Sequence, residues 1–172
     1  MPNWCNNWTH FRHEDKKEVE RLQQAAKEGK LFAEFVPNPN GPDAEDWYAH
    51  NIANWGTKWD TEANTDAPID YDEDAKLYTL SIGFDTAWSP PIQFYEHLLE
   101  QGWTVDAYYF EPGMNFCGTF TEGFDDYYEI PETPEEAEEN LPEDLEEVFG
   151  ICDMLWERRE NEAWEEEDEE EQ

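Results

Sequence analysis

The uneven distribution of acidic residues constrains this chain more than any other feature of its sequence. Residues 1–124 hold 22 acidic and 8 basic side chains, whereas residues 125–172 hold 23 acidic and 2 basic ones. Together they give a net charge of -35. Charge of one sign at this density repels itself and excludes ordinary affinity for nucleic acid or for an anionic membrane. The expected partner is a strongly basic molecule.

Aromatic residues show that part of the chain nevertheless forms a packed core. They make up 16% of the sequence, too many for a disordered chain. We predict one domain at 1–124 and an acidic helical extension at 125–172. There is no apolar run of membrane-spanning length, and "MPNWCNNWTH" lacks the features of a secretion signal. Cys5, Cys117 and Cys152 form no CxxC pair, which favours a reduced, cytoplasmic setting.

Hydrophobic periodicity predicts alternating strands and helices in the first 124 residues. A helix over 15–28 has Asp15 as its expected cap and ends at Gly29, and a second is expected to begin with Ser89 as its cap. The order β-α-β-β-α-β-β predicts an α+β fold, with two helices on one face of an antiparallel sheet. The predicted strands include 4–12, 76–85, 103–110 and 115–124.

The acidic extension also has a helical pattern. "TPEE" at 133–136 is a capping box, and a helix from 142 to 171 is predicted to follow it. The end of this helix, "EEEDEEEQ", is expected to fray. Its apolar stripe is predicted to dock on the domain or on another copy, so a homodimer through 141–156 is one alternative. The stripe consists of Leu141, Leu145, Val148, Phe149, Cys152, Leu155 and Trp156.

The stretch "NWGTKWD" at 54–60 places a lysine between two tryptophans. If it is extended, Trp55 and Trp59 share one face. The favoured interpretation puts both tryptophans in the core and pairs Lys58 with Asp60 or another carboxylate. The alternative makes Lys58 a site residue with a shifted pKa.

Four sequence blocks resemble the signature of the YubB ferredoxin-like family of small plasmid- and phage-borne proteins. They are "MPNWCNN", "NWGTKWD", "FDTAWSPP" and "YFEPGMNFCG", in that order over residues 1–118. The resemblance implies a ferredoxin-like α+β sandwich from a mobile element, without a settled activity. The acidic extension departs from the family. The matching residues are Trp4, Cys5, Asn54, Trp55, Gly56, Lys58, Trp59, Asp60, Trp88, Ser89, Pro90, Pro91, Glu111, Pro112, Gly113, Cys117 and Gly118.

Candidate catalytic and metal-binding residues have simpler explanations. Cys5, His10, His13 and Cys117 do not have the spacing of a zinc site. Ser89 is interpreted as a helix cap, and cysteines in aromatic surroundings usually behave as small hydrophobic residues. Gly-rich phosphate loops are absent from the sequence. We therefore expect no enzymatic activity, no metal and no cofactor.

The acidic surface itself predicts a function. A helix from 142 to 171 would be about 45 Å long, with one of its 15 acidic side chains per roughly 3 Å. DNA presents one phosphate per roughly 3.4 Å of each strand. We therefore predict a nucleic-acid mimic that blocks the basic DNA- or RNA-binding groove of a host restriction, CRISPR or recombination protein, with loops 43–46 and 66–74 as a second row. The predicted contact residues are Asp43, Glu45, Asp46, Asp70, Asp72, Glu73, Asp74, Glu135, Glu136, Glu143, Asp144, Glu146 and Glu147.

Other functions fit part of the pattern. A partner-binding accessory protein would use an aromatic pocket, with the acidity serving solubility or salt adaptation. Alternatively, the extension is a solubilising or dimer-forming tail without an outside partner. The expected pocket residues are Trp55, Lys58, Trp59, Asp60, Trp88 and Glu111.

Overall fold

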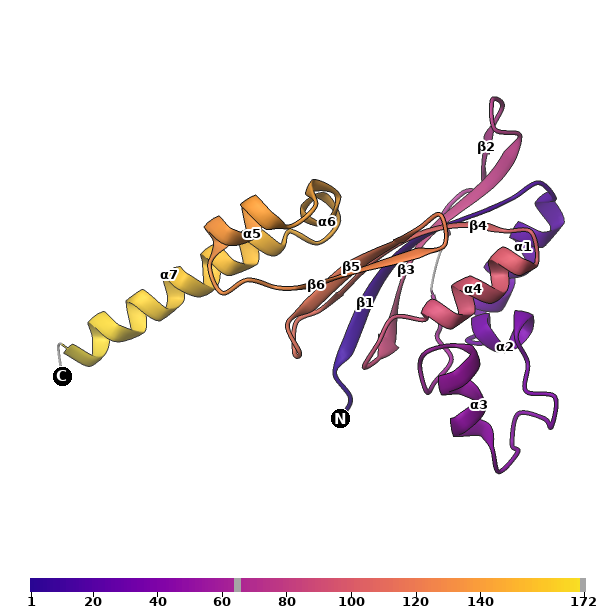
Figure 1. Ribbon diagram of the computed structural model, residues 1–172, viewed down its shortest axis with the longest axis horizontal. Coiled ribbons are helices and arrows are strands. Elements are labelled where there is room, and N and C mark those ends of the chain that lie inside the picture. The colour runs from indigo at the N-terminus through magenta and orange to yellow at the C-terminus, as the bar shows by residue number, and fades with distance from the viewer. Residues whose placement is uncertain (64–65, 171–172) are drawn as a thin grey trace.

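The protein has an α+β fold built on one antiparallel sheet of six strands (Figure 1). The computed structural model describes residues 1–63 and 66–170, and for 166–170 it describes the backbone alone. The strands are β1 (Trp4–His13), β2 (Asp70–Asp72), β3 (Leu77–Ala87), β4 (Thr104–Glu111), β5 (Phe116–Thr121) and β6 (Phe124–Glu129). The seven helices within the described residues are α1 (Lys16–Lys27), α2 (Leu31–Phe35), α3 (Trp47–Asn54), α4 (Ile92–Glu100), α5 (Pro134–Asn140), α6 (Glu143–Phe149) and α7 (Ile151–Glu170).

Strand β1 lies inside the sheet, whose order is β2-β3-β1-β4-β5-β6. It pairs antiparallel with β3, where Trp4 faces Ala87, and with β4, where Phe11 faces Val105. Strands β5 and β6 extend the sheet beyond β4 as consecutive antiparallel neighbours. The domain boundary predicted between residues 124 and 125 falls at the start of β6, so the sheet continues across it.

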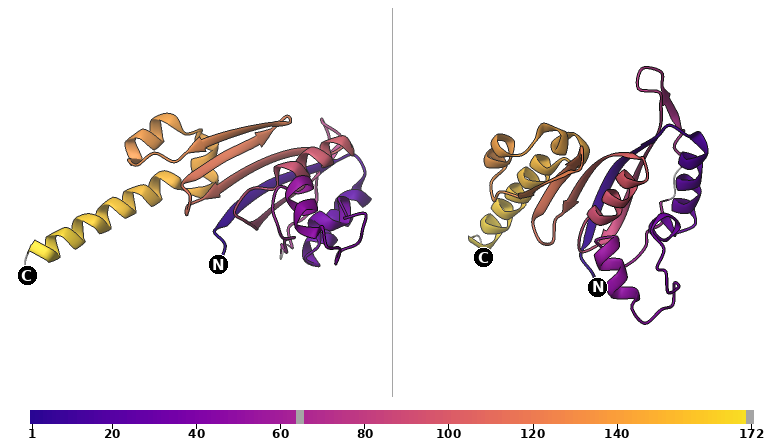
Figure 2. Two further views of the ribbon diagram at one scale, coloured as in Figure 1. Left: turned by 60° about the horizontal axis from the view of Figure 1, so that its bottom comes forward. Right: turned by 45° about the vertical axis from the view of Figure 1, so that its right-hand side comes forward.

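One face of the sheet is covered by α1 and α4, as predicted for two helices on one side. Alternation along β1 buries every second residue, including Phe11. Phe11 belongs to a core that contains Leu22 of α1 and Phe94 of α4. Short helices α2 and α3 complete this layer. Figure 2 shows these four helices together on one side of the sheet.

The last three helices form a second core with the other face of β4 and β5. Leu145 of α6 and Leu155 of α7 are buried against Phe110 and Cys117. Phe110 has the opposite parity in β4 from Val105, which belongs to the first core. The sheet therefore lies between the two helical groups (Figure 2). The predicted apolar stripe docks on its own domain, and a homodimer through 141–156 stays a prediction.

Helix starts differ in how well local signals predict them. The Asp15 side chain accepts the N–H of Lys17 and caps α1, and Thr133 likewise accepts the N–H of Glu136 in α5. Both predicted caps are confirmed. The cap predicted at Ser89 is wrong, because α4 begins at Ile92. The Ser89 hydroxyl instead donates a hydrogen bond of 2.5 Å to the carbonyl of Gly56.

The single helix predicted from 142 to 171 is wrong, because the chain turns at Gly150. This residue ends α6 with φ 62° and ψ 43°, a left-handed conformation that glycine adopts at little cost. A separate helix, α7, starts at Ile151 and extends away from the sheet (Figure 1). Glu171 and Gln172, which belong to the segment predicted to fray, lie outside the described residues, as do the side chains of 166–170.

Candidate functional site

Helix α6 presents a group of exposed carboxylates beside the sheet. Its apolar side packs on β4 and β5, and Glu143, Asp144 and Glu147 are exposed. Glu146 differs, because its carboxylate accepts a hydrogen bond of 2.6 Å from the backbone N–H of Cys152. That bond satisfies an amide in the first turn of α7. Glu146 is therefore a structural residue as well as an acidic one.

Two carboxylates of helix α5 accept hydrogen bonds from side chains of α7. Glu135 accepts a hydrogen bond of 2.7 Å from Nη1 of Arg159, and this interaction lowers the pKa of Glu135. Glu138 accepts a hydrogen bond of 3.3 Å from the indole N–H of Trp156. Glu136 is exposed and forms no ion pair with any residue that the structure describes. Of the two residues predicted in α5, Glu136 is the one available to a partner.

Residues 156–170 of α7 form an acidic arm that extends beyond the second core (Figures 1 and 2). Ten of the 20 residues of α7 are Asp or Glu. At about 1.5 Å of rise per residue the helix is about 30 Å long, so it carries one acidic residue per roughly 3 Å. Trp164 lies on this arm and is 71% exposed. Helix α7 is shorter than the helix of about 45 Å predicted over 142–171, but its average linear density of acidic residues is similar.

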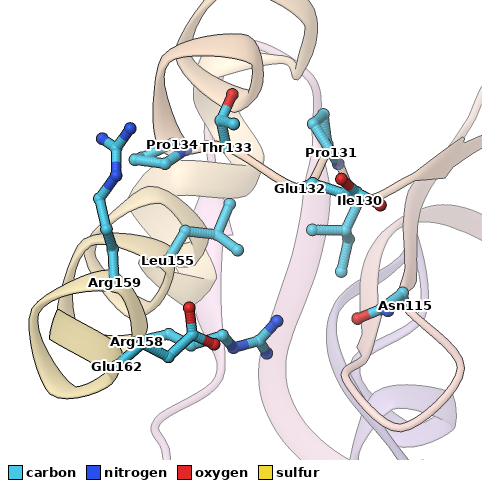
Figure 3. Close-up of a pocket in the computed structure, with 10 residues that line it drawn as sticks. All are labelled: Asn115, Ile130, Pro131, Glu132, Thr133, Pro134, Leu155, Arg158, Arg159 and Glu162. Atoms are coloured by element: carbon cyan, nitrogen blue, oxygen red, sulfur yellow. The ribbon is translucent and has the colours of Figure 1, made fainter. Parts of the chain in front are cut away.

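Both basic residues of the acidic extension lie where α7 leaves the sheet. Arg158 lines a hollow of about 500 Å³ between α7, the start of α5 and the β4–β5 turn. In Figure 3 its side chain points across this hollow toward Asn115, away from Arg159. Arg158 forms no ion pair with a described residue, whereas Arg159 is bound to Glu135. Arg158 and Arg159 are also the only basic residues in the sequence of α7.

The acidic loops predicted to form a second row lie elsewhere. Figure 1 places the loop before α3 and the β2–β3 hairpin at separate corners of the molecule, each well away from α5 to α7. Asp46 accepts hydrogen bonds from the side-chain amides of Asn38 and Asn40, and Asp72 accepts two backbone amides of its own turn. The structure therefore does not bring the three acidic groups into one row. The predicted contact residues in these loops are all exposed: Asp43, Glu45, Asp46, Asp70, Asp72, Glu73 and Asp74.

The stretch "NWGTKWD" is the end of a helix followed by a turn and bends, so it is not extended. Trp55 is buried and donates its indole N–H to the carbonyl of Val36 at 2.8 Å, while Trp59 is 42% exposed. The two tryptophans therefore do not share a buried face. The Nζ atom of Lys58 lies 3.9 Å from the centroid of the Trp59 ring, a cation–π contact. Lys58 forms no ion pair with Asp60 or with another carboxylate that the structure describes, so the predicted pairing is wrong in both of its forms.

Asp60 and Glu111 have structural roles that involve backbone amides. Asp60 accepts the N–H groups of Phe32 and Ala33, each at 2.9 Å, and so caps α2 from a distant part of the chain. Burial raises its pKa, although these hydrogen bonds act in the opposite direction. Glu111 is 1% exposed and accepts two amides of the turn between β4 and β5.

The six predicted pocket residues are divided among several places. Trp55 lines a hollow of about 280 Å³ with Trp47, and Asp60 lines another, of about 410 Å³, with Trp4. Trp88 is an exposed residue with φ 72° beside the start of β1. Sequence reasoning did not assign Trp4 a role in a site, although it belongs to the first resembling block. Trp4 comes close to the segment after Trp59 because β1 pairs with β3, and this pairing is not visible in the local sequence.

The cysteines lack the properties of catalytic nucleophiles. Cys5, Cys117 and Cys152 are all buried free thiols. Burial raises the pKa of Cys117 to about 12, and burial together with Glu146 raises that of Cys152 to about 12. The pKa of Cys5 is raised further, again mainly by burial. Each thiol is therefore protonated at neutral pH and unreactive.

We expect alkylation of these thiols in the folded protein at pH 8 to be about a hundredfold or more slower than in urea. The raised pKa values mean that the folded state holds these protons more tightly than the unfolded state. Their contribution to stability should therefore be lost as the pH rises from about 9 towards about 12. Mass spectrometry after timed iodoacetamide exposure checks the rates. Rapid labelling of Cys117 under native conditions would contradict the burial seen here.

These features define an acidic α+β protein with carboxylates concentrated on three C-terminal helices. Across residues 1–63 and 66–170, no helix has both the length and the apolar character needed to cross a membrane. No group of side chains suited to a metal ion occurs in the part of the chain that the structure describes. Comparison of the chain with protein-family models, with curated proteins and with solved structures finds no match.

Proposed function

We propose that this protein is a non-enzymatic mimic of nucleic acid that occupies the basic nucleic-acid-binding groove of a host protein. The observation that carries the proposal is the average density of acidic residues along α6 and α7. One acidic residue per roughly 3 Å is close to the roughly 3.4 Å between phosphates along one DNA strand. On binding a basic partner, these helices would release associated cations, much as DNA does.

The second core supports this function because it fixes the acidic helices to a rigid sheet. Leu145 and Leu155 anchor α6 and α7, and the Glu135–Arg159 pair joins α5 to α7. A disordered acidic tail would have to be ordered on binding, which costs free energy. A docked helix has much of that order already.

We also propose a ferredoxin-like arrangement for β1 to β4. The order β2-β3-β1-β4, with α1 after β1 and α4 after β3, supports it. The resemblance to the YubB family stays a prediction. For a protein of a plasmid or phage, the useful targets are defence or recombination nucleases such as restriction enzymes and CRISPR effectors.

The test compares the wild type with the variant Glu143→Gln/Asp144→Asn/Glu147→Gln, which leaves the α7 cap at Glu146 intact. Basic proteins captured from bacterial lysate at low salt and eluted by a salt gradient are purified and assayed for DNA binding. The wild type should inhibit DNA binding, and the logarithm of its affinity should fall linearly with the logarithm of salt concentration. Each neutralised contact should reduce that slope by about 1.

A variant with the same net charge separates local contacts from the overall field. Glu14→Gln/Glu96→Gln/Glu100→Gln removes three exposed carboxylates near α1 and α4, far from α6. It should retain the wild-type salt slope. Equal loss in both triple variants, or a complex that leaves DNA binding by the partner unchanged, would reject the proposal.

A partner-binding accessory protein is the second candidate. The observation that favours it is the exposure of Trp4, Trp59 and Trp88, since large exposed aromatic groups mark interaction sites. Trp4→Ala/Trp59→Ala would then abolish capture of the partner, whereas the α6 triple variant would not.

A further inference from the structure

A second surface with binding character lies at the N-terminal end of β1, apart from the acidic helices. Trp4 and Trp59 are 46% and 42% exposed, and their ring centroids are 6.4 Å apart. Soluble proteins rarely leave two adjacent indoles half in solvent without a function. The rings come from segments distant in sequence that the edge of β3 brings together.

One of these rings already binds a cation. The ammonium of Lys58 lies 3.9 Å from the centroid of Trp59, within the distance at which the ring quadrupole attracts positive charge. No cation–π contact to Trp4 is formed by the residues that the structure describes. Of the two adjacent indoles, Trp4 is therefore the one that a cation from a partner could contact.

A groove of about 410 Å³ adjoins Trp4. Its lining includes the segment 60–63 and the end of β3 from Gly83 to Asp85. Asp60 uses its carboxylate to accept backbone amides, whereas the Asp85 carboxylate is exposed and is oriented by a hydrogen bond of 2.7 Å from the Asn6 amide. Trp4 and Asp85 thus line the same hollow, together with the exposed Glu62.

We infer that this groove binds the guanidinium group of an arginine side chain from a protein partner. A planar guanidinium stacks on an indole while its N–H groups donate to a carboxylate, which an ammonium does less well. The rim carries Glu62 and Asp85, so a nucleobase with its phosphate would be repelled. The site goes beyond the proposed mimicry, because it does not use the carboxylates of α5 to α7.

The test is an NMR titration of the full chain with N-acetyl-arginine amide and with its lysine counterpart. The indole N–H signals of Trp4 and Trp59, assigned with Trp4→Phe and Trp59→Phe, should shift with arginine and shift less with lysine. Trp103, which is 4% exposed in the first core, serves as an internal reference that should not move. Trp4→Ala should weaken binding by about two- to fivefold, as expected for an exposed cation–π contact, and Trp4→Phe should weaken it less.

Charge variants test the contribution of the carboxylates. Asp85→Asn and Glu62→Gln should each weaken arginine binding, whereas Glu96→Gln, which changes the net charge equally on the far side of α4, should not. Equal shifts with arginine and lysine, equal effects of all three charge variants, or shifts of Trp4 with a dinucleotide but not with arginine would overturn the inference. These outcomes are independent of the DNA-competition assay, so either proposal can fail alone.

Discussion

Replacing Leu145 by alanine should lower the free energy of unfolding by about 2–5 kcal/mol and detach the acidic helices from the sheet. Leu145 is fully buried in the second core, where α6 contacts β4 and β5. Its truncation leaves a cavity where α6 packs on the sheet. Urea denaturation measures the loss of stability. Relative to the wild type, amide hydrogen exchange in the variant should become faster in α5 to α7 and change less in β1 and β3.

A matched variant in the other core provides the control. Leu98 of α4 is equally buried, and Leu98→Ala should cost a similar free energy without releasing the acidic helices. If the carboxylates must be held rigidly, Leu145→Ala should weaken inhibition of DNA binding, and Leu98→Ala should not. Leu145→Val, with a smaller cavity, serves where the alanine variant does not fold. Full inhibition by a protein whose α6 and α7 exchange freely would show that rigid mimicry is not needed.

Sequence periodicity predicts the first core well because its signals are local. The alternation in β1 and the cap at Asp15 each depend on residues within a few positions. The cap at Thr133 is predictable for the same reason. The α+β class, the antiparallel sheet and the two helices on one face can all be predicted from elements with such local signals.

Elements without a local apolar pattern escape prediction. Strand β6 exposes almost all of its residues and carries Asp125, Asp126 and Glu129, so it has no buried alternation. It forms because β5 offers an edge with which it can pair. Gly150 breaks the predicted long helix although the apolar spacing continues through it, since periodicity does not register a change of direction at one residue.

Among the predicted site residues too, properties set by nearby residues could be predicted, whereas contacts with residues far away in the sequence could not. Lys58 and Asp60 are two positions apart, and their proximity suggests an ion pair. Instead, the Asp60 carboxylate accepts hydrogen bonds from the backbone N–H groups of Phe32 and Ala33 in α2, which are 28 and 27 residues away in sequence. Exposure of Glu143 and Asp144 follows from the apolar stripe of α6, whereas the separation of the other acidic loops depends on the whole topology. The groove beside Trp4 likewise exists only once β1 pairs with β3.

Gly118→Ala should be the most damaging small substitution in the sheet. A Cβ atom at this position would overlap the hydroxyl and ring of Tyr109 and the backbone carbonyl of Asp126, on the strands to either side. Tyr109 is 1% exposed and donates a hydrogen bond of 2.6 Å to Asp125. Burial raises the pKa of Tyr109, so its hydroxyl stays protonated as the donor. Overpacking and the loss of this bond should together cost about 2–6 kcal/mol.

The clash predicts strong coupling between Gly118 and Tyr109. In a Tyr109→Ala background the ring is gone, so Gly118→Ala should cost less than it does in the wild type, with the Asp126 carbonyl accounting for what is left. Gly83→Ala is the matched control in another strand, because the nearest neighbour of the added Cβ would be the half-buried Trp8 ring, at 3.2 Å. In urea denaturation, Gly83→Ala should lower the free energy of unfolding by well under half as much as Gly118→Ala does. Additive costs for Gly118→Ala and Tyr109→Ala would mean that the tyrosine does not lie over the glycine, and the packing of β4 on β5 would then need another explanation.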